Sequence, residues 1–310
     1  MRHSSLPKVV VLMAAYNGVP WIKQQIDSIL NQTQVEVTLF ISVDLSVDGT
    51  EEFVDRIASQ DNRVVVLPHG AKFGGAGPNF YRLIRDVNFS NFDCVAFADQ
   101  DDIWLSNKLS RACVAISQLN AEAFSNNVTA LWSDGRQMLI NKSQPQVRWD
   151  FLFEAAGPGC TYVLSARLAK DIQQFVTSHV EQMQKIALHD WFMYAYARSK
   201  GYLWVIDAEP SMLYRQHSQN QVGANTGFKA FFYRVNKVLR GWGLSQSATI
   251  AKAIGLLDKK SVGAWLSGTR IGYLRLAGNF WQCRRRFRDK FFFLGACLLL
   301  ALLGTKIDQN

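Results

Sequence analysis

Paired cysteines are missing from this 310-residue sequence. The cysteines are odd in number and scattered, with no Cys-X-X-Cys pair: Cys94, Cys113, Cys160, Cys283 and Cys297. This pattern argues against a zinc site and a disulfide framework, and it fits a reducing compartment. The first residues also lack the apolar stretch of a signal peptide, so we expect a cytoplasmic protein.

The two common phosphate-binding loops are missing as well. No Walker-type loop with its lysine occurs, and no Gly-X-Gly-X-X-Gly follows the first apolar run. Gly74-Gly75-Ala76-Gly77 is only a weak phosphate-loop signal, and a tight turn that lets backbone segments approach explains it better. A bound nucleotide would therefore need another partner for its phosphates, such as a metal held by carboxylates.

Low-complexity tracts and repeats are absent, and only 19% of the residues are charged, which argues against disorder. The charge is unevenly placed. The formal net charge is +9, yet residues 226–310 contain 15 Lys and Arg against 3 Asp and Glu. We therefore expect a near-neutral globular domain over 1–225 and a basic C-terminal region over 226–310.

Strands and helices alternate in the first half of the sequence. Four apolar runs have the length of buried strands: Val9–Ala15, Val37–Val43, Val64–Leu67 and Val95–Ala98. Apolar residues at helical spacing lie between them, and Pro78 fits the first turn of one helix. This alternation predicts a parallel sheet covered on both faces, with the strand ends on one rim. That rim would gather Tyr16, Asn17, Asp44, Asp48 and the acidic residues from Asp99 onward.

Three carboxylates follow the fourth run within four positions. Asp99, Asp101 and Asp102 stand where the strand must end, and carboxylates this close repel one another and favour a cation. Such oxygen ligands suit Mg²⁺ or Mn²⁺, which commonly bind together with substrate phosphates. The alternative is a solvated acidic turn or a helix N-cap, with Asp102 or Ser106 capping a helix that begins near Asn107.

Four segments together resemble the inverting glycosyltransferases of family 2, which have the GT-A fold. They are residues 11–18, 25–33 and 41–50, and the run Asp99-Gln100-Asp101-Asp102-Ile103-Trp104 followed by Lys108-Leu109. The last is similar to the Asp-X-Asp segment of the rhamnosyltransferase-like branch, whereas Val43 and Leu45 depart from the family pattern. The resemblance covers roughly residues 8–225. It implies an α/β fold with a Rossmann-like, mostly parallel sheet that binds a nucleotide sugar, followed by a mainly helical extension.

The resemblance also implies roles for individual residues. The donor site would consist of Ala15, Tyr16, Asn17, Asp44, Asp99 and Arg215. Asp101 would bind Mg²⁺ or Mn²⁺ on the donor diphosphate, with His217 as a further ligand. Supporting or acceptor-side residues would be Asp102, Trp104, Gly159, Cys160, His189 and Trp191. From the residues alone, Tyr16 could equally be a packing aromatic, and Asp48 is better explained as a turn and helix cap.

The candidate general base is Asp190, in the run Leu188-His189-Asp190-Trp191-Phe192. Inverting transfer needs one base to take the proton of the acceptor hydroxyl, while a metal stabilises the departing diphosphate. Aromatic neighbours reduce the hydration of the carboxylate and raise its basicity. The family places its Glu-Asp or His-Asp pair at a helix start. The alternative, that Asp190 only caps this helix, is disfavoured by the motifs upstream.

The basic region contains two segments that suit a membrane surface. Residues 228–240 mix apolar and cationic side chains like an amphipathic helix, and a basic cluster at 284–290 precedes the uncharged run Phe291–Gly304. As a helix these 14 residues would span about 21 Å, short of the ~30 Å hydrocarbon core. We expect an anchor in the plane of the inner membrane face. Packing on the body or a homodimer is the alternative, and no motif supports nucleic-acid binding.

The resemblance thus implies a metal-dependent glycosyltransferase peripheral to the membrane. It would move L-rhamnose from dTDP-rhamnose, or a hexose from a UDP-sugar, onto a glycan or lipid-linked acceptor in cell-surface polysaccharide synthesis. Two alternatives stay open. One is a metal-dependent nucleotidyltransferase, which would be expected to carry a glycine-rich, basic loop after the first strand. The other is a non-enzymatic basic membrane-binding protein.

Overall fold

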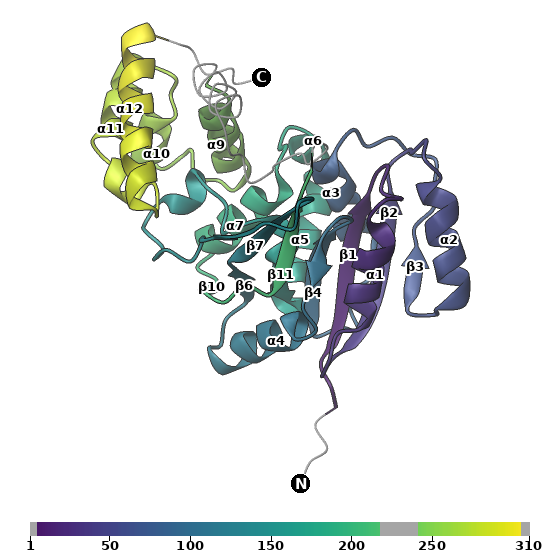
Figure 1. Cartoon of the computed structure of the whole chain (residues 1–310). Helices are drawn as coiled ribbons and strands as arrows, with labels where there is room; N and C mark the ends of the chain where they lie inside the picture. Colours follow the sequence, from purple (N-terminus) through teal and green to yellow (C-terminus); the bar gives the residue numbers. More distant parts are fainter. Residues whose placement is uncertain (1–4, 218–240, 305–310) are drawn as a thin grey trace.

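A seven-stranded sheet forms the centre of the computed structural model, which describes residues 5–217 and 241–304 (Figure 1). Its strands are β1 (Lys8–Ala15), β2 (Glu36–Val43), β3 (Val64–Val66), β4 (Cys94–Asp99), β6 (Ala123–Asn126), β9 (Val163–Ser165) and β10 (Trp204–Asp207). The order is β10-β6-β9-β4-β1-β2-β3, and only β9 runs antiparallel to its neighbours. The four predicted strands and the mostly parallel sheet are confirmed.

The central strand β1 shows how the sequence builds this sheet. Val9 and Val11 belong to the core on one face, and Val10 and Leu12 to the core on the other, all without exposed surface. A strand buried on both faces reads as a continuous apolar run because alternate side chains point to opposite faces. The register places Ala14 of β1 opposite Asp99 of β4, so the ends of the two strands lie together.

Helices cover both faces of the sheet. Those of the first two thirds are α1 (Ile22–Leu30), α2 (Thr50–Gln60), α3 (Ala76–Asp86), α4 (Lys108–Gln118), α5 (Ala166–Ser178), α6 (Val180–Met183) and α7 (His189–Ser199). The α3, α5 and α7 helices share the core of Val10, and α1 and α4 share that of Val9. Pro78 lies in the first turn of α3, as predicted. The N-cap of α4 is Asn107, without a side-chain cap, so the alternative in which Asp102 or Ser106 caps this helix is wrong.

A smaller sheet lies beside the carboxyl end of β4, and its strands were not predicted. It consists of β5 (Ile103–Trp104), β7 (Val128–Trp132), β8 (Gln137–Ile140) and β11 (Met212–Gln216). The order is β5-β11-β7-β8. Met212 of β11 pairs with Trp104 of β5, which brings the Tyr214–Gln216 segment next to the acidic run. Two short 3₁₀ helices, η1 (Asp150–Leu152) and η2 (Gly159–Thr161), follow β8.

The C-terminal helices project from one end of the body (Figure 1). They are α9 (Trp242–Ala253), α10 (Lys260–Trp265), α11 (Arg270–Ala277) and α12 (Phe287–Leu303), with the 3₁₀ helix η3 (Phe280–Gln282) before α12. They share the core of the body: the rings of Trp149 and Trp265 lie 5.5 Å apart, and those of Phe153 and Phe293 lie 5.0 Å apart. The predicted boundary near residue 225 and the predicted helix at 228–240 lie outside the described residues, and the two-domain division stays a prediction.

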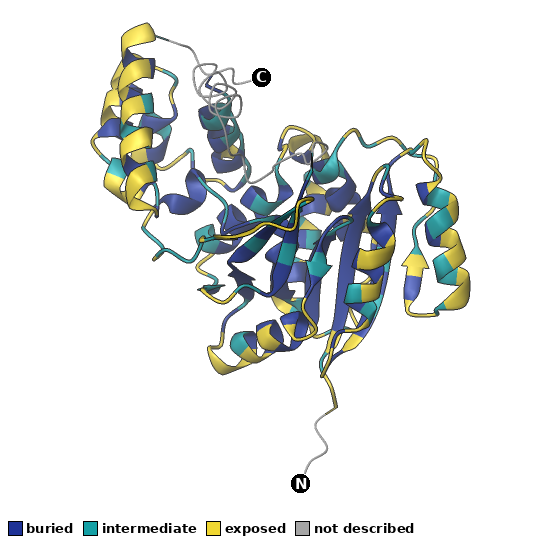
Figure 2. Ribbon diagram, viewed as in Figure 1, coloured by how far each residue is buried: buried dark blue, intermediate teal, exposed yellow. Residues whose placement is uncertain are grey.

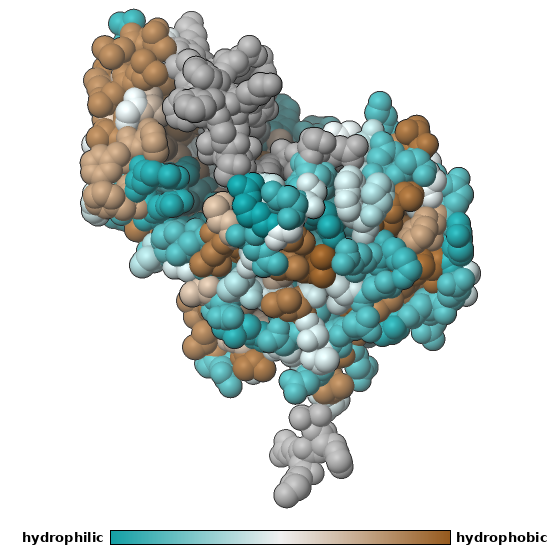
Figure 3. All heavy atoms as spheres, in the orientation of Figure 1, coloured by the Kyte–Doolittle hydropathy of each residue, from teal (hydrophilic) through white to brown (hydrophobic). Residues whose placement is uncertain are grey.

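The α11–α12 pair keeps many apolar side chains on its surface (Figure 2, Figure 3). The exposed ones on these helices and η3 are Ile271, Leu274, Trp281, Phe287, Phe291, Phe292, Leu298, Leu299, Leu302 and Leu303. Within 5–217 and 241–304, no helix combines the length and the apolar content needed to cross a bilayer.

Candidate active site

A cavity of about 2030 Å³ opens at the carboxyl ends of β1, β2 and β4, the position where open α/β sheets bind ligands. Eleven of the predicted site residues line it: Ala15, Tyr16, Asn17, Asp44, Asp99, Asp101, Gly159, His189, Asp190, Trp191 and His217. The other four, Asp102, Trp104, Cys160 and Arg215, lie behind its wall. An ordinary ligand pocket measures about 300–1,000 Å³, so this cavity has room for two substrates.

Asp44, at the end of β2, organises one wall of the cavity. Its carboxylate is buried and accepts hydrogen bonds from the backbone N–H groups of Leu45, Phe73 and Gly74, at 2.8–2.9 Å. These bonds fix the glycine loop before α3, where Gly74 has a left-handed φ of +79°. The loop therefore works as the tight turn that the sequence indicated, with Asp44 as its anchor.

The loops after β1 and β4 are joined by a side chain that the sequence analysis did not single out. Gln100 accepts a hydrogen bond from the Tyr16 N–H at 2.8 Å and donates one to the Tyr16 carbonyl at 2.7 Å. A Cβ on Gly18 would lie 2.2 Å from the Gln100 Oε1 atom, so Gly18 leaves room for this contact. The Tyr16 side chain is 56% exposed at the cavity, so the alternative of a packing aromatic is wrong.

Asp101 and His217 meet at the cavity wall. The His217 Nε2 atom lies 2.7 Å from Asp101 Oδ2, and the His217 ring stacks on Trp21 at a centroid distance of 4.0 Å. Arg215 supports them from behind: its Nε donates to the Asp101 carbonyl at 2.8 Å, and its backbone N–H donates to Asp102 at 3.2 Å. A carboxylate and an imidazole on one cavity wall are a donor set that a divalent cation can use.

An acidic cluster lies at this wall, with Asp99 lining the cavity and Asp102 and Cys160 buried behind it. Asp99, Asp102 and Cys160 each place one ligand-type atom within 4.8 Å of the others. Burial and the nearby Asp101 raise the pKa of Asp99 to about 7, and burial also raises the pKa of Asp102. Burial likewise raises the pKa of the Cys160 thiol, so Cys160 stays protonated beside the two carboxylates. The donors that line the cavity and could reach a divalent cation there are therefore Asp99, Asp101 and His217.

Lys108, the first residue of α4, places a positive charge beneath the cluster. It is 1% exposed, and its ammonium lies 4.5 Å from the centre of the Trp104 ring. Burial lowers the pKa of Lys108 to about 8, against the opposing effect of Cys160 and Asp102. Its ammonium has no hydrogen-bond partner within the described ranges, so its contribution is charge balance for the acidic cluster.

Asp190 enters the cavity from the first turn of α7. The N-cap of this helix is Leu188, which makes the cap alternative for Asp190 wrong. The Trp191 N–H donates to the Asp190 carboxylate at 2.7 Å. Burial outweighs that bond and raises the pKa of Asp190 to about 6. A partly buried carboxylate with this pKa can accept a proton from a substrate hydroxyl near neutral pH.

His189 packs between the sheet and Gly159. Its ring stacks on Phe80 at a centroid distance of 4.0 Å, and burial lowers the pKa of His189 to about 3, so the ring is neutral. A Cβ on Gly159 would lie 2.7 Å from His189 Nε2 and 3.1 Å from the Asp190 Cβ. Gly159 is therefore required for close approach, and a larger residue would push His189 or Asp190 out of place.

Lys142 and Arg284 also line the cavity and were missed as site residues. Lys142 follows β8, and its charge acts on Asp190 by lowering the pKa of that carboxyl. Arg284 precedes α12, and its Nη1 atom donates to the Phe153 carbonyl at 2.7 Å. No spacing in the sequence links Lys142 to Asp190, since the strands that bring them together carry no strong pattern. Arg284 was noted only as part of a basic cluster.

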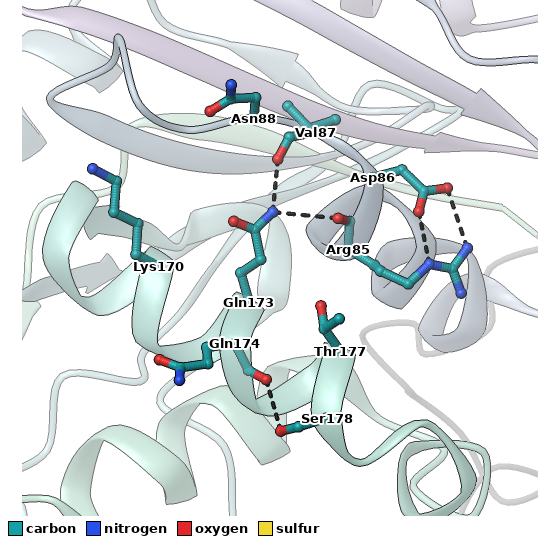
Figure 4. Close-up of a pocket in the computed structure, with 9 residues that line it drawn as sticks. All are labelled: Arg85, Asp86, Val87, Asn88, Lys170, Gln173, Gln174, Thr177 and Ser178. Carbon is teal, nitrogen blue, oxygen red and sulfur yellow. Dashed lines mark hydrogen bonds and ion pairs between the residues drawn. The ribbon is translucent and has the colours of Figure 1, made fainter.

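A second, smaller hollow lies where α3 ends beside α5 (Figure 4). The Gln173 side chain points into it and donates to the carbonyl groups of Ile84 and Val87 at 2.7 Å. Arg85 pairs with Asp86 at 2.7 Å. These polar groups satisfy one another and tie α5 to the end of α3, so we interpret this hollow as a helix junction.

Comparison with known sequences agrees with the site. Residues 10–137 match the family model described as Glycosyl transferase family 2. The chain is 44% identical to dTDP-rhamnosyl transferase RfbG of Shigella flexneri over 283 residues, which are 91% of this chain and 97% of RfbG. It is 28% identical over 181 residues to WfgD of Escherichia coli, a UDP-Glc:alpha-D-GlcNAc-diphosphoundecaprenol beta-1,3-glucosyltransferase. That match covers 56% of this chain and 66% of WfgD.

Solved structures show the same fold at low sequence identity. TarS of S. aureus, in complex with UDP-GlcNAc, has a TM-score of 0.53 and 14% identity, covering 96% of this chain and 90% of its own. The mannosyltransferase PcManGT of Pyrobaculum calidifontis, in complex with GDP-Man and Mn²⁺, has a TM-score of 0.51 and 13% identity, covering 97% and 88%. These likenesses confirm the GT-A fold. At such low sequence identities they show the fold alone.

Proposed function

This chain belongs to glycosyl transferase family 2, and we propose that it transfers L-rhamnose from dTDP-L-rhamnose to a glycan or lipid-linked acceptor in cell-surface polysaccharide synthesis. The sugar is proposed from the similarity to the dTDP-rhamnosyl transferase; a hexose from a UDP-sugar is the second candidate. As a glycosyltransferase the chain is neither a nucleotidyltransferase nor a non-enzymatic membrane-binding protein. The observation that carries the proposal is that Asp101 and Asp190 line the same cavity.

We propose that the donor lies along the ends of β1, β2 and β4. The nucleoside would rest against the backbone of Ala15 and beside Tyr16, with Asn17 and Asp44 shaping this wall. The sugar would face Asp99. Arg215 acts in this proposal by holding Asp101 in position, because its guanidinium Nε bonds the Asp101 carbonyl.

Asp101, His217 and Asp99 would hold the divalent cation that GT-A glycosyltransferases commonly use. The mixed oxygen and nitrogen donors favour Mn²⁺ over Mg²⁺, because imidazole is a softer ligand than carboxylate. A bound cation would offset the negative charge of the departing nucleoside diphosphate. Asp102, Lys108 and Cys160 support the carboxylates from behind the wall.

Asp190 would accept the proton of the acceptor hydroxyl as that oxygen attacks the anomeric carbon. Its raised pKa of about 6 keeps it mostly ionised at neutral pH yet more basic than an exposed aspartate. The Trp191 N–H orients the carboxylate, and Gly159 leaves it room to approach the sugar. His189 would form part of the cavity wall as a neutral ring, since its pKa is about 3.

We further propose that the α11–α12 surface lies on the inner face of the membrane. Exposed Leu302 and Leu303 provide apolar area at the end of α12, where Gly304 lies beside the side chain of exposed Arg270. Exposed Arg275 of α11 and Arg286 before α12 belong to the same helix pair. Apolar area flanked by arginines suits an anionic lipid surface, where each cation contributes about 1 kcal/mol. A homodimer through this surface is the competing explanation.

A thermal-shift panel tests the proposed donor and metal. We expect dTDP-L-rhamnose with Mn²⁺ to raise the Tm of the full chain, and either component alone to raise it less. Asp101→Asn should lose this synergy because it removes a metal ligand, whereas Asp190→Asn should keep it. If UDP-glucose gives the larger shift, the hexose donor replaces rhamnose. Absence of any metal-dependent shift with both nucleotide sugars would overturn the proposal.

A further inference from the structure

Three exposed apolar side chains line the donor end of the cavity, where β1 and β2 end. The exposed fraction is 56% for Tyr16, 48% for Leu45 and 90% for Val47, and all three residues belong to the cavity lining. Tyr16 follows β1, and Leu45 and Val47 follow β2. Single apolar residues scattered on a surface need no explanation, whereas apolar residues gathered in a groove mark a binding site. This end of the cavity therefore offers apolar surface to the part of the donor that it holds.

Backbone hydrogen bonds hold Leu45 and Val47 in place. The Val47 N–H donates to Asn17 Oδ1 at 2.9 Å. The Leu45 N–H donates to Asp44 Oδ1 at 2.9 Å and to the Ala71 carbonyl at 3.2 Å. The loop after β2 is thus tied to the loop after β1 on one side and to the segment before α3 on the other. A loop fixed on both sides presents its side chains to a ligand without the entropy cost of ordering a free loop.

The order of the strands brings the base of the donor to these side chains. The strands β4, β1 and β2 are neighbours in the sheet. Neighbouring strands lie about 4.8 Å apart, so the ends of β4 and β2 are about 10 Å apart. Asp101 follows β4 and is the proposed cation ligand beside the diphosphate. A nucleotide that extends from Asp101 along the strand ends therefore places its base at the end of β2, where Leu45 and Val47 lie in the next loop.

Thymine differs from uracil only in the methyl group on C5, which forms no hydrogen bond. Stacking on the Tyr16 ring cannot distinguish the two bases, because every base has a π-face. Hydrogen bonding cannot distinguish them either, since both bases carry the same N3–H and carbonyl groups. Where proteins read thymine in nucleic acids, apolar side chains contact its methyl group. Leu45 and Val47 provide such side chains at the donor end of the cavity.

We infer that Leu45 and Val47 contact the 5-methyl group of a thymine base and make the donor site selective for thymine nucleotides over uracil nucleotides. The two residues determine specificity and take no part in the transfer step. The choice between a dTDP-sugar and a UDP-sugar is thus made at the base, independently of the sugar. This inference rests on the proposed function, because it requires the donor nucleotide to lie along the ends of β4, β1 and β2.

Binding of four nucleoside diphosphates separates the base methyl from the 2′-hydroxyl. They are dTDP, dUDP, 5-methyl-UDP and UDP, each titrated calorimetrically into the full chain with Mn²⁺ present. We expect the methylated base to bind roughly four- to tenfold more tightly in both the deoxyribose pair and the ribose pair, which is the effect of one methyl group in an apolar pocket. Equal affinities within each pair, or a preference that follows the 2′-hydroxyl alone, would overturn the inference.

Leu45→Asn and Val47→Thr replace the apolar side chains by polar ones of similar size. Each should weaken dTDP binding yet leave dUDP binding within about twofold, because dUDP has no methyl group to lose contact with. Leu119→Asn at the end of α4 and Val65→Thr on β3 make the same changes at exposed positions outside the cavity, and they should keep the preference for dTDP. Equal weakening of dTDP and dUDP would show a structural role only. That result, or an unchanged preference in the Leu45→Asn, Val47→Thr double variant, would overturn the inference.

The proposed function is scored by a different signal. If dTDP and dUDP bind alike while dTDP-L-rhamnose with Mn²⁺ still raises the Tm, the inference is wrong and the proposed function stands. If dTDP is preferred through Leu45 and Val47 but no nucleotide sugar gives a Mn²⁺-dependent shift, the proposed function is wrong and the base selectivity stands.

Discussion

The α7 and α12 helices are both rich in aromatic and aliphatic residues, but they meet opposite surroundings. Eight of the eleven residues of α7 are buried, against four of the seventeen of α12. α7 packs between the sheet and α3 and α5, and it carries Asp190 in its first turn. α12 rests one side on α11 and leaves large apolar side chains such as Leu302, which is 77% exposed, on its surface. An apolar helix therefore needs an apolar contact surface, but its composition does not show whether protein or lipid provides that surface.

A buried charge network joins the two helices. Asp150 accepts a hydrogen bond from Tyr194 of α7 at 2.8 Å and pairs with Arg198 at 3.2 Å. Arg285, just before α12, lies 3.8 Å from Asp150 and donates to the Ala155 carbonyl at 2.7 Å. The position of α12 is thus coupled to the start of the loop that ends at Gly159, and so to the active site.

Of these changes, Asp190→Asn should have the largest effect on activity, and it alters α7 without changing α12. Losing the general base should lower kcat by roughly 10²–10⁴-fold, measured as dTDP release in the presence of acceptor. Vesicle flotation and donor-induced thermal shift should not change. Asp27→Asn, on the exposed surface of α1, is the matched control and should retain full activity. Activity in Asp190→Asn within threefold of the unaltered chain would exclude Asp190 as the base.

Arg285→Leu should break the link between α7 and α12. It leaves the buried Asp150 carboxylate short of a partner, and removing one member of a buried pair costs about 3–5 kcal/mol. Urea unfolding measures this loss. Arg288→Leu, which removes an exposed pair with Asp289, should cost about 1 kcal/mol or less. A similar small cost for Arg285→Leu would show that the network does not hold the two parts together.

Leu302→Ser combined with Leu303→Ser should affect only α12. Burying one leucine in an apolar medium stabilises by about 1.5–3 kcal/mol, so the loss of two should lower partitioning onto anionic vesicles roughly a hundredfold or more. Thermal shift with dTDP-L-rhamnose and Mn²⁺ should stay as it is. If sedimentation instead shows a dimer that these changes dissociate, the surface is an interface between copies of the chain.

The pH dependence of kcat/KM sharpens the role of α7. Burial raises the pKa of Asp190 from its ordinary 3.8 to about 6, and the base works only when ionised. The rate should therefore rise with pH through about 6 and level off above it, with about a tenfold loss at pH 5. A rise in kcat/KM with its midpoint near pH 4 would mean that Asp190 is exposed to water in the working enzyme.

The strongly patterned half of the molecule was predictable from sequence. Strands such as β1 and β4 are continuous apolar runs, because a parallel sheet buries both faces. The ends of these runs predicted that Tyr16, Asp44 and Asp99 lie at the same edge of the sheet. Asp190 was chosen for its aromatic neighbours and for the family's His-Asp pair at a helix start, and the structure places it in the first turn of α7 and in the cavity lining.

The smaller sheet and the α12 side of the cavity were not predictable. Strands β5 and β8 are short, and β8 is largely exposed. Neither therefore shows the alternation of apolar and polar residues by which a strand is recognised in a sequence. Lys142 reaches the site only through that sheet, and Arg284 only through tertiary packing of the C-terminal helices. Gln100 was visible inside the acidic run, but its backbone contacts with Tyr16 depend on strand register.

A crystal structure of the chain with dTDP-L-rhamnose and Mn²⁺ tests the central claim most directly. We predict an anomalous manganese peak bonded to Asp101 and to the donor diphosphate, with the anomeric carbon between that diphosphate and the Asp190 carboxylate. A manganese peak remote from Asp101, or an Asp190 side chain turned away from the sugar, would contradict the account.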